Sequence, residues 1–384
     1  MAEAWKPKSF SYGESGVDVH VEAEASRTLY EYSQLTSKNR LGRLGEITTL
    51  HDDFRGVRYS DVGELPAGTV TYEFADGAGS KPEIARIAGN LRTIYTDLAE
   101  ASGADAACRG YEPVHLVVHV KVNTLGQDND RLRQIQELAA GSVDATARLG
   151  ISISNGELAQ DNTMGSLDQF RFELAGMMTG YSHESRLVDS SKIKPGEPLV
   201  GFLEPGFRTN GHSLVRDILE YYYGPDWGEE IFMGQRLADL VLRPSEVYTP
   251  ALVDMTGGYD LRRPALAEFD GAVNISGGGI PEKLGSLLKA SGCGAIIDNP
   301  FQPPTPMDLV QRLGMVPDKE AYNTLCMGTG LIVVTSDPDS VIEVGKKHGL
   351  TGKEIGSVTD EPVIWIKNRG AVQDQKWLEF PVAA

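Results

Sequence analysis

Short runs of β-branched and aromatic residues alternate with long helical patterns along this chain, and this alternation is the strongest constraint on its fold. Residues 69–74 (TVTYEF) and 114–122 (VHLVVHVKV) have the composition of strands. Residues 128–149 place apolar side chains three and four positions apart, which is typical of an amphipathic helix, and Gly150 follows as an end signal. Strands mixed with long helices predict an α/β fold in which helices cover each sheet.

The same style continues through the rest of the chain. Residues 84–107 predict one helical stretch weakened by Gly89 and Gly103, and residues 151–154 predict a short strand that enters a turn at residues 155–157. Further expected elements are strands at 170–180, 199–203 and 330–335, helices at 213–222 and 281–290, and helices around Leu237 and Tyr248.

The length of 384 residues predicts two domains, because single cores rarely grow beyond about 250 residues. The chain becomes polar after residue 182, and the segment KPGEP at residues 194–198 contains prolines and a glycine, which commonly interrupt helices and strands. We therefore expect an N-terminal domain over residues 10–186 and a C-terminal domain over residues 187–372.

The formal net charge of −18 argues against a nucleic-acid partner, because so acidic a surface repels a phosphate backbone. No apolar run approaches the roughly 18 residues that a membrane span needs, and the N-terminus lacks the apolar stretch of a secretory signal. Cys108, Cys293 and Cys326 form no C-x-x-C pair, which fits a reducing compartment. These observations predict a soluble cytoplasmic protein with neither a membrane nor a nucleic-acid partner.

Three glycine-containing turns each lead into an expected helix, at residues 76–81, 210–213 and 277–281. Free backbone N–H groups and the positive end of a helix hold anions at such places. Each could equally be a plain turn, and none has the P-loop pattern or the dinucleotide fingerprint. Three of them in one chain still favour a phosphorylated ligand.

Carboxylates accompany the first of these turns. Asp76 lies in the turn itself, Asp97 and Asp105 lie on the helical stretch that follows, and Glu157 lies in the expected turn at residues 155–157. Mg²⁺ bound to a nucleotide takes one or two carboxylates together with phosphate oxygens. The alternative is that these side chains are simply solvated, as most of the 54 acidic residues must be. The hypothesis of a magnesium–nucleotide site therefore requires the fold to bring these carboxylates together.

The histidine spacing does not indicate a metal site. His115 and His119 lie in an expected strand, where four residues separate their Cα atoms by roughly 13 Å, too far for one metal ion. His212 stands at an expected helix start, and no G-x-S-x-G motif accompanies it.

A series of motifs occurs in an order and spacing that match one known family. TNGHSLVR lies at residues 209–216, DGAGSK at residues 76–81 and GYEP at residues 110–113. They resemble S-N-G-Y-S-L-V-R, D-G-V-G-T-K and G-A-E-P of the phosphoribosylformylglycinamidine cyclo-ligase (AIR synthase) family. Further similar segments lie at residues 11–19, 156–157, 238–248, 276–279 and 322–330, so that the resemblance covers about residues 10 to 370.

The resemblance implies an AIR-synthase-like two-domain fold, with an N-terminal sheet that forms a barrel-like homodimer and a C-terminal α/β sandwich. It implies ATP-dependent cyclisation of formylglycinamidine ribonucleotide to 5-aminoimidazole ribonucleotide, with release of ADP and phosphate, in purine biosynthesis. The implied cofactors are ATP and Mg²⁺, with K⁺ as a second candidate cation. The implied partners are the small-molecule ribonucleotide and a second copy of the chain.

Individual roles also follow from the resemblance. The expected metal ligands are Asp76, Asp97 and Asp105. The expected catalytic residues are Asp76, Asp105, Arg208 and His212. The residues expected to bind the nucleotide, the phosphate or the ribonucleotide are Gly77, Gly79, Lys81, Asp97, Glu157, Asn210, Gly211 and Ser213.

The chain also departs from the family pattern. Arg208 stands where the family has a histidine, His212 where it has a tyrosine and Ala75 where it has a threonine. Leu158 follows Glu157 in place of a threonine, and the family's glycine-rich G-G-F-G is reduced to GRLGE at residues 42–46. Two alternatives therefore stay open. One is another ATP-dependent enzyme of the superfamily, related to thiamine-phosphate kinase, selenophosphate synthetase or hydrogenase-maturation proteins, and the other is a binding or regulatory paralogue without turnover.

Overall fold

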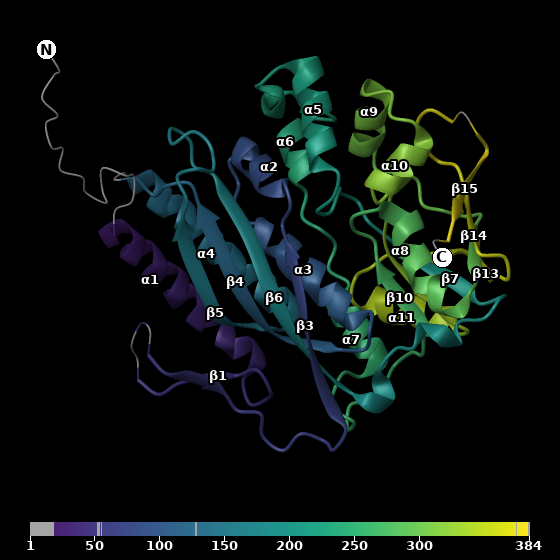
Figure 1. The fold of residues 1–384 in the computed structure, drawn as a ribbon, viewed down its shortest axis with the longest axis horizontal. Helices are drawn as coiled ribbons and strands as arrows, with labels where there is room; N and C mark the ends of the chain where they lie inside the picture. The colour runs from purple at the N-terminus through teal and green to yellow at the C-terminus, as the bar shows by residue number, and fades with distance from the viewer. Residues whose placement is uncertain (1–18, 52–53, 55, 127–128, 374, 383–384) are drawn as a thin grey trace, which may run out of the picture.

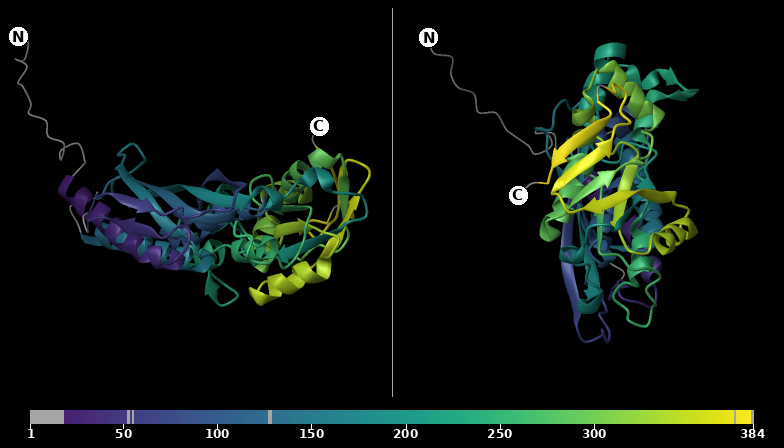
Figure 2. Two further views of the ribbon diagram at one scale, coloured as in Figure 1. Left: turned by 90° about the horizontal axis from the view of Figure 1, so that it is seen from below. Right: turned by 90° about the vertical axis from the view of Figure 1, so that its right-hand side faces the viewer.

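The structure is a computed structural model that describes residues 19–51, 54, 56–126, 129–373 and 375–382. The similar segment at residues 11–19 therefore lies outside the described residues, apart from Val19. Two β-sheets with packed helices form an elongated molecule, with the N-terminal half of the chain at one end and the C-terminal half at the other (Figures 1 and 2). The expected α/β fold is confirmed, whereas the barrel-like dimer stays a prediction.

The first sheet has four strands in the order β3-β6-β4-β5. Their bounds are β3 Thr69–Gly77, β6 Phe172–His183, β4 Glu112–Val122 and β5 Ser152–Gln160. β4 pairs antiparallel with β6 and parallel with β5. The helices of this half are α1 Val19–Thr36, α2 Lys81–Ala88, α3 Ile94–Ala107 and α4 Asn129–Leu149. A small hairpin of β1 Ile47–Thr49 and β2 Arg58–Ser60 follows α1.

The second sheet has seven strands in the order β10-β12-β7-β13-β11-β14-β15. Their bounds are β10 Gly271–Asn274, β12 Thr329–Val334, β7 Pro198–Leu203, β13 Gly352–Thr359, β11 Gly294–Ile297, β14 Val363–Lys367 and β15 Trp377–Pro381. The helices of this half are α5 His212–Tyr223, α6 Leu237–Leu242, α7 Thr249–Thr256, α8 Gly279–Leu288, α9 Thr305–Leu313, α10 Asp318–Thr324 and α11 Pro338–Lys347. Strands β8 Ile231–Phe232 and β9 Gln235–Arg236 form a short hairpin.

Helix α3 is one of the elements that join the two halves; α2, which contacts α5 and α6, is another. Helix α3 packs on β3, β4 and β6 of the first sheet, and it also contacts α7 and β10 of the second half. All of its residues except Asp105 are buried. Polar side chains on this helix therefore either find partners inside the protein or, like Asp105, lie at the edge of the space between the halves.

The face of the first sheet opposite α3 is open. Phe74, Leu174 and Met178 point toward the core under α3, and the alternate residues of the same strands are exposed, as the period of a strand requires. The exposed set on this open face comprises Thr71, Glu73, Ala75, Glu173, Ala175, Met177, His119 and Glu157. We name these residues the open sheet face.

Two sequence expectations are corrected locally. The predicted helix over residues 84–107 is two helices, because Gly89 adopts a left-handed conformation (φ 65°) and ends α2. The predicted turn at residues 155–157 is instead the middle of β5, where Asn155, Gly156 and Glu157 pair with Val117, Val118 and His119 of β4.

Candidate functional site

The first two glycine turns lie against each other across the junction of the two halves. Gly79 has a left-handed φ of 56°, and a Cβ built on it would lie 3.4 Å from the carbonyl oxygen of Thr209. The Ser80 hydroxyl donates to the Ser213 hydroxyl, or accepts from it, over 3.1 Å between their Oγ atoms. The turn that follows β3 and the turn that starts α5 therefore form one continuous surface.

Helix α8, which follows the third glycine turn, contributes Lys283 to the same region. This helix begins after Gly278, which also adopts a left-handed φ of 85°. Lys283 on its first turns lies close enough to Asp76 to lower the pKa of that carboxyl group. A cavity of about 570 Å³ opens beside these groups, a size that small-molecule sites commonly have. We name it the central cleft; its polar lining residues are Asp105, Arg109, Ser190, Asn274, Lys283 and Ser286.

Asp76 is the half-buried carboxylate at the end of β3. Burial raises its pKa, and the negative charge of Asp105 raises it further. The Gly77 N–H, which donates to Asp76 Oδ1 over 2.7 Å, and the positive charges of Lys283 and Arg208 act in the opposite direction. Two carboxylates that repel each other beside a cleft favour the binding of a cation.

Asp97 and Lys81 do not face the cleft. Lys81 Nζ lies 2.7 Å from Asp97 Oδ1 with both side chains fully buried, and Nζ also donates to the carbonyl of Arg243. Ser245 donates to the same oxygen of Asp97 through its backbone N–H and its hydroxyl. Each group neutralises the other inside the protein, which argues against direct contacts with metal or phosphate, and the sequence-based roles of Asp97 and Lys81 stay predictions.

Arg208 and His212 are also buried rather than catalytic contacts. Arg208 is 2% exposed and forms an ion pair with Glu204 over 2.9 Å. His212 donates from Nε2 to the carbonyl of Arg208, and burial together with the charge of Lys81 lowers the pKa of His212 to about 3. A neutral, enclosed imidazole cannot exchange protons with a substrate in the cleft near neutral pH. This geometry argues against direct contacts of Arg208 and His212 with a substrate, and their sequence-based catalytic roles stay predictions.

The remaining residues of the second turn have distinct positions. Gly211 begins α5 with a left-handed φ of 70°, and a Cβ there would lie 2.5 Å from the Leu325 side chain. The Asn210 amide nitrogen is buried without a hydrogen-bond partner among the described residues. Ser213 is exposed beside Ser80. Asn210 and Ser213 therefore keep polar groups available at the junction with the first turn.

Glu157 lies apart from the other expected residues. It belongs to β5, whereas Asp76 belongs to β3 at the opposite edge of the same sheet. Three strand spacings separate the two edges by about 14 Å. Glu157 lines a different cavity, of about 370 Å³, under α1.

Sequence reasoning missed three polar residues at the junction, namely Glu100, Asn274 and Lys283. Both Glu100 carboxylate oxygens accept hydrogen bonds from the start of α7, at Tyr248 and Thr249, and burial raises the pKa of Glu100 to about 7. Asn274 ends β10 and donates to Asp105 Oδ1 over 3.3 Å. No motif marked these residues, because each gains its role only from contacts between the halves.

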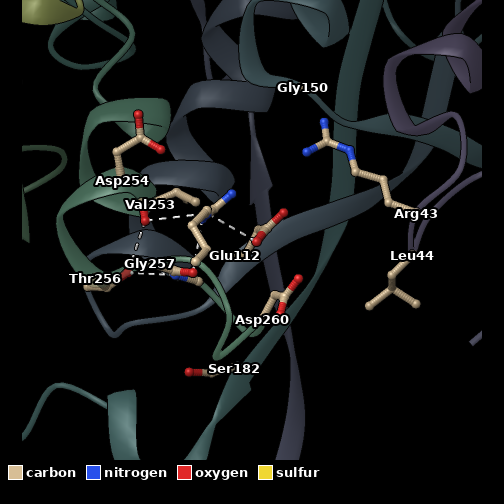
Figure 3. A network of polar contacts seen from close by, with 12 residues as sticks. Arg43, Leu44, Glu112, Gly150, Ser182, Val253, Asp254, Thr256, Gly257 and Asp260 are labelled. Atoms are coloured by element: carbon tan, nitrogen blue, oxygen red, sulfur yellow. Dashed lines mark hydrogen bonds and ion pairs between the residues drawn. The ribbon is translucent and has the colours of Figure 1, made fainter. Parts of the chain in front are cut away.

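A second polar network fixes the far side of the junction. Glu112 at the start of β4 accepts from Arg40 over 2.7 Å and from Arg263 over 3.2 Å. Figure 3 shows Glu112 beside the end of α7, where Val253, Thr256 and Gly257 lie, while Arg43 directs its guanidinium group toward Gly150. Arg263 also donates to the carbonyls of Val253 and Gly257, so its bond to Glu112 links the end of α7 to the first sheet. Of these contacts, only the pair of Arg263 and Glu112 crosses between the halves, whereas Arg40 and Glu112 both belong to the first half.

Asp76 and Asp105 are the carboxylates of the site that could hold a metal ion. Among the residues that the structure describes, no group of three or more histidine, cysteine or acidic side chains is placed to bind a metal. Asp76 and Asp105 remain as a pair whose charges interact beside the cleft. Two carboxylates suffice for a Mg²⁺ ion that takes its other ligands from phosphate oxygens and water, so this pair fits Mg²⁺ bound together with a nucleotide.

Within the described part of the chain, none of the helices has the length and apolar character needed to span a membrane.

Comparison with known sequences supports the family suggested by the motifs. Residues 194–367 match the family model of the AIR synthase related protein, C-terminal domain. Phosphoribosylformylglycinamidine cyclo-ligases match over nearly the whole chain. The one from Acetivibrio thermocellus is 28% identical over 91% of this chain and 97% of its own. Those from Picosynechococcus sp. and Thermococcus kodakarensis are both 27% identical, over 90% and 94% of this chain and 96% and 98% of their own. These matches confirm the resemblance.

Solved structures share the fold. Thiamine-monophosphate kinase from Stenotrophomonas maltophilia K279a matches with a TM-score of 0.57, at 13% identity over 88% of this chain and 95% of that chain. T. maritima PurL complexed with ATP matches with a TM-score of 0.53, at 17% identity over 95% of this chain and 52% of that chain. This chain thus spans about half the length of the T. maritima PurL chain. At these identities the similarity concerns the fold alone.

Proposed function

We propose that this chain, whose residues 194–367 belong to the AIR synthase related C-terminal domain family, catalyses ATP-dependent closure of an imidazole ring. In the proposed reaction, formylglycinamidine ribonucleotide and ATP give 5-aminoimidazole ribonucleotide, ADP and phosphate, a step of purine biosynthesis. The cyclo-ligases that match over 90% or more of this chain support the assignment. The acidic surface and the cysteine pattern favour a cytoplasmic setting.

The observation that carries the proposal is the meeting of three glycine turns beside Asp76 and Asp105. Gly79 backs onto Thr209, Ser80 contacts Ser213, and Lys283 lies near Asp76. The start of α5 and the start of α8 provide free backbone N–H groups and positive helix ends, which suit phosphate groups. A triphosphate and a ribonucleotide phosphate are the two anions that the proposed reaction has to hold.

The reaction itself needs charge stabilisation more than covalent chemistry. ATP transfers its γ-phosphoryl group to the formyl oxygen, the attacking nitrogen forms the new C–N bond, and phosphate leaves with that oxygen. We assign Lys283 to a phosphate group and the Ser213 hydroxyl to the ribonucleotide side of the cleft. Asp76 and Asp105 would hold Mg²⁺, which supplies positive charge against the triphosphate. Asn210, with its unpartnered amide nitrogen, is a further donor for the substrate.

We also propose that the protein acts as a homodimer through the open sheet face. Met177 of β6 is an exposed large side chain on this face, and no helix of the described residues packs on the face in Figure 1. If two such sheets close into a barrel, β5 of one copy meets β3 of the other, because each sheet has these strands at its edges. Glu157 would then approach the cleft of the second copy, which offers an explanation for its distance from Asp76 within one chain.

The proposed function is tested with purified protein, ATP, Mg²⁺, K⁺ and formylglycinamidine ribonucleotide. We expect ADP release that depends on the ribonucleotide, formation of the aminoimidazole product, and loss of both in the Asp76→Asn variant. A thermal-shift series runs in parallel, in which both ATP and the ribonucleotide should stabilise the protein. Stabilisation by ATP without any response to the ribonucleotide would instead indicate a different small substrate.

A further inference from the structure

Arg208 is fixed inside the protein by its backbone conformation and by the partners of its guanidinium group. Its φ of 55° lies in the left-handed region, which a non-glycine residue adopts at a cost of about 1 kcal/mol or more. Its guanidinium group pairs with Glu204 and stacks over the Tyr248 ring at 5.1 Å. A strained backbone and a fully enclosed guanidinium group indicate that this arginine acts on its neighbours inside the protein.

One of those neighbours connects it to the central cleft. Arg208 Nη2 donates to Asn274 Oδ1 over 2.6 Å. A guanidinium group can only donate hydrogen bonds, so Asn274 has to turn its amide oxygen toward Arg208. The amide nitrogen then points the other way, where it donates to Asp105 Oδ1 over 3.3 Å and to the carbonyl of Ala101 over 3.4 Å.

We infer that Arg208 is a positioning residue which, by fixing the amide of Asn274, holds the Asp105 carboxylate toward the central cleft for the metal-bound nucleotide. The inference rests on the proposed function, because it concerns the same carboxylate pair. It gives the arginine that stands in place of the family's histidine a role without any contact to substrate.

Asp105 needs such a hold, because a competing partner lies on its other side. Arg109, one turn further along the chain, approaches Asp105 Oδ2 to 3.9 Å, and both side chains are partly exposed. Without the Asn274 donor, Asp105 is free to turn toward Arg109 and away from Asp76. Asn274 can keep its donor in place only while Arg208 occupies the amide oxygen. The arrangement therefore makes the geometry of an exposed carboxylate depend on a buried cation.

The test is a double-mutant cycle read by binding of Mg²⁺ with a non-hydrolysable ATP analogue, measured by titration calorimetry without ribonucleotide. We expect Arg208→Gln to weaken Mg²⁺-dependent binding about tenfold, as loss of a hydrogen bond to a charged group does. In an Asp105→Asn background, the same Arg208→Gln change should have no further effect. The matched control is Arg40→Gln, which removes another buried arginine paired with a carboxylate, and it should lower the melting temperature without altering Mg²⁺-dependent binding.

Two results would overturn the inference. One is an equal loss of binding on Arg208→Gln in both backgrounds, which would show that Arg208 acts independently of Asp105. The other is unchanged Mg²⁺-dependent binding in Asp105→Asn, which would remove Asp105 from the metal side. If Arg208→Gln fails to fold, Asn274→Ser interrupts the same connection and is read in the same cycle. Because no ribonucleotide is present, failure of the cyclisation reaction would refute the proposed function and leave this result unaffected.

Discussion

The buried ion pair between Lys81 and Asp97 offers a direct test of whether these two residues stabilise the fold or bind a ligand. The motifs predict that these residues bind phosphate and metal, whereas the structure encloses both side chains completely and places them 2.7 Å apart. The change to make is Asp97→Asn, which removes the negative charge and keeps the size of the side chain. If the pair is structural, the cost appears in stability; if Asp97 binds metal, it appears in nucleotide affinity.

The expected size of the stability loss follows from burial. Removing one partner of a buried pair costs about 3–5 kcal/mol, because the other charge stays in the interior without compensation. Each kcal/mol corresponds to about 2–4 °C for a cooperative unit of 150–250 residues, so the melting temperature should fall by about 6–20 °C. The matched control is Lys121→Met, which breaks the partly exposed pair of Lys121 and Asp161 at 2.6 Å. That pair should contribute only about 0–1 kcal/mol.

Thermal and chemical denaturation measure the stability, and calorimetry with the ATP analogue and Mg²⁺ measures the affinity of protein that is still folded. The double variant Lys81→Met with Asp97→Leu should recover part of the loss, since it buries no unpaired charge. Recovery stays incomplete because the Ser245 N–H loses its acceptor, at about 1–3 kcal/mol. A variant Asp97→Asn with unchanged melting temperature and strongly weakened Mg²⁺-dependent binding would refute this reasoning and restore the sequence-based role.

Three further outcomes are expected. Between about pH 4.5 and 7 the folded protein holds a proton on Glu100 that the unfolded chain has lost, so the free energy of unfolding should fall as the pH rises. In Glu100→Gln, chemical denaturation should show a weaker dependence of this free energy on pH. The pKa of His212 is lowered to about 3 in the folded protein, so below about pH 6.5 only the unfolded chain binds a proton there, and the protein should lose stability as the pH falls. His212→Asn should make the free energy of unfolding less dependent on pH in this range, and an unchanged dependence would contradict the prediction. Mixing inactive Asp76→Asn and Glu157→Gln subunits under exchange should restore about a quarter of the activity if sites are shared between copies of a dimer, and none if each chain holds a whole site.

The regular elements were predictable from the sequence because they follow local rules. The strands around residues 69–77 and 112–122 have β-branched and aromatic side chains, and the helix Asn129–Leu149 keeps its apolar period until Gly150. The break in the helical stretch was recognisable only as a weakness at Gly89, since nothing local decides whether a glycine ends a helix or lies within it. Local patterns thus determined which elements form and left their exact ends to packing.

The positions of the glycine turns were predictable from the sequence, whereas the roles of the carboxylates were not, and this difference has a physical cause. Glycine turns need particular backbone conformations, so their residue types show in the sequence, and the structure brings the turn at Gly79 against the turn that starts α5. The chemical role of a carboxylate depends instead on what lies across the junction. Asp97 meets Lys81, while Asp105, two turns further along the same helix, meets only an amide and an exposed arginine.

Helix α3 shows how one element can carry both kinds of carboxylate. Its buried positions face both halves, so Asp97 pairs with a buried cation and Glu100 accepts hydrogen bonds from the start of α7. The second carboxylate oxygen of Asp97 has no hydrogen-bond partner among the described residues. Asp105 escapes this only because the helix there reaches the edge of the cleft. Of the three acidic residues on this helix, Asp97 and Glu100 therefore stabilise the join between the halves, whereas Asp105 lies at the cleft because it alone is exposed at the edge.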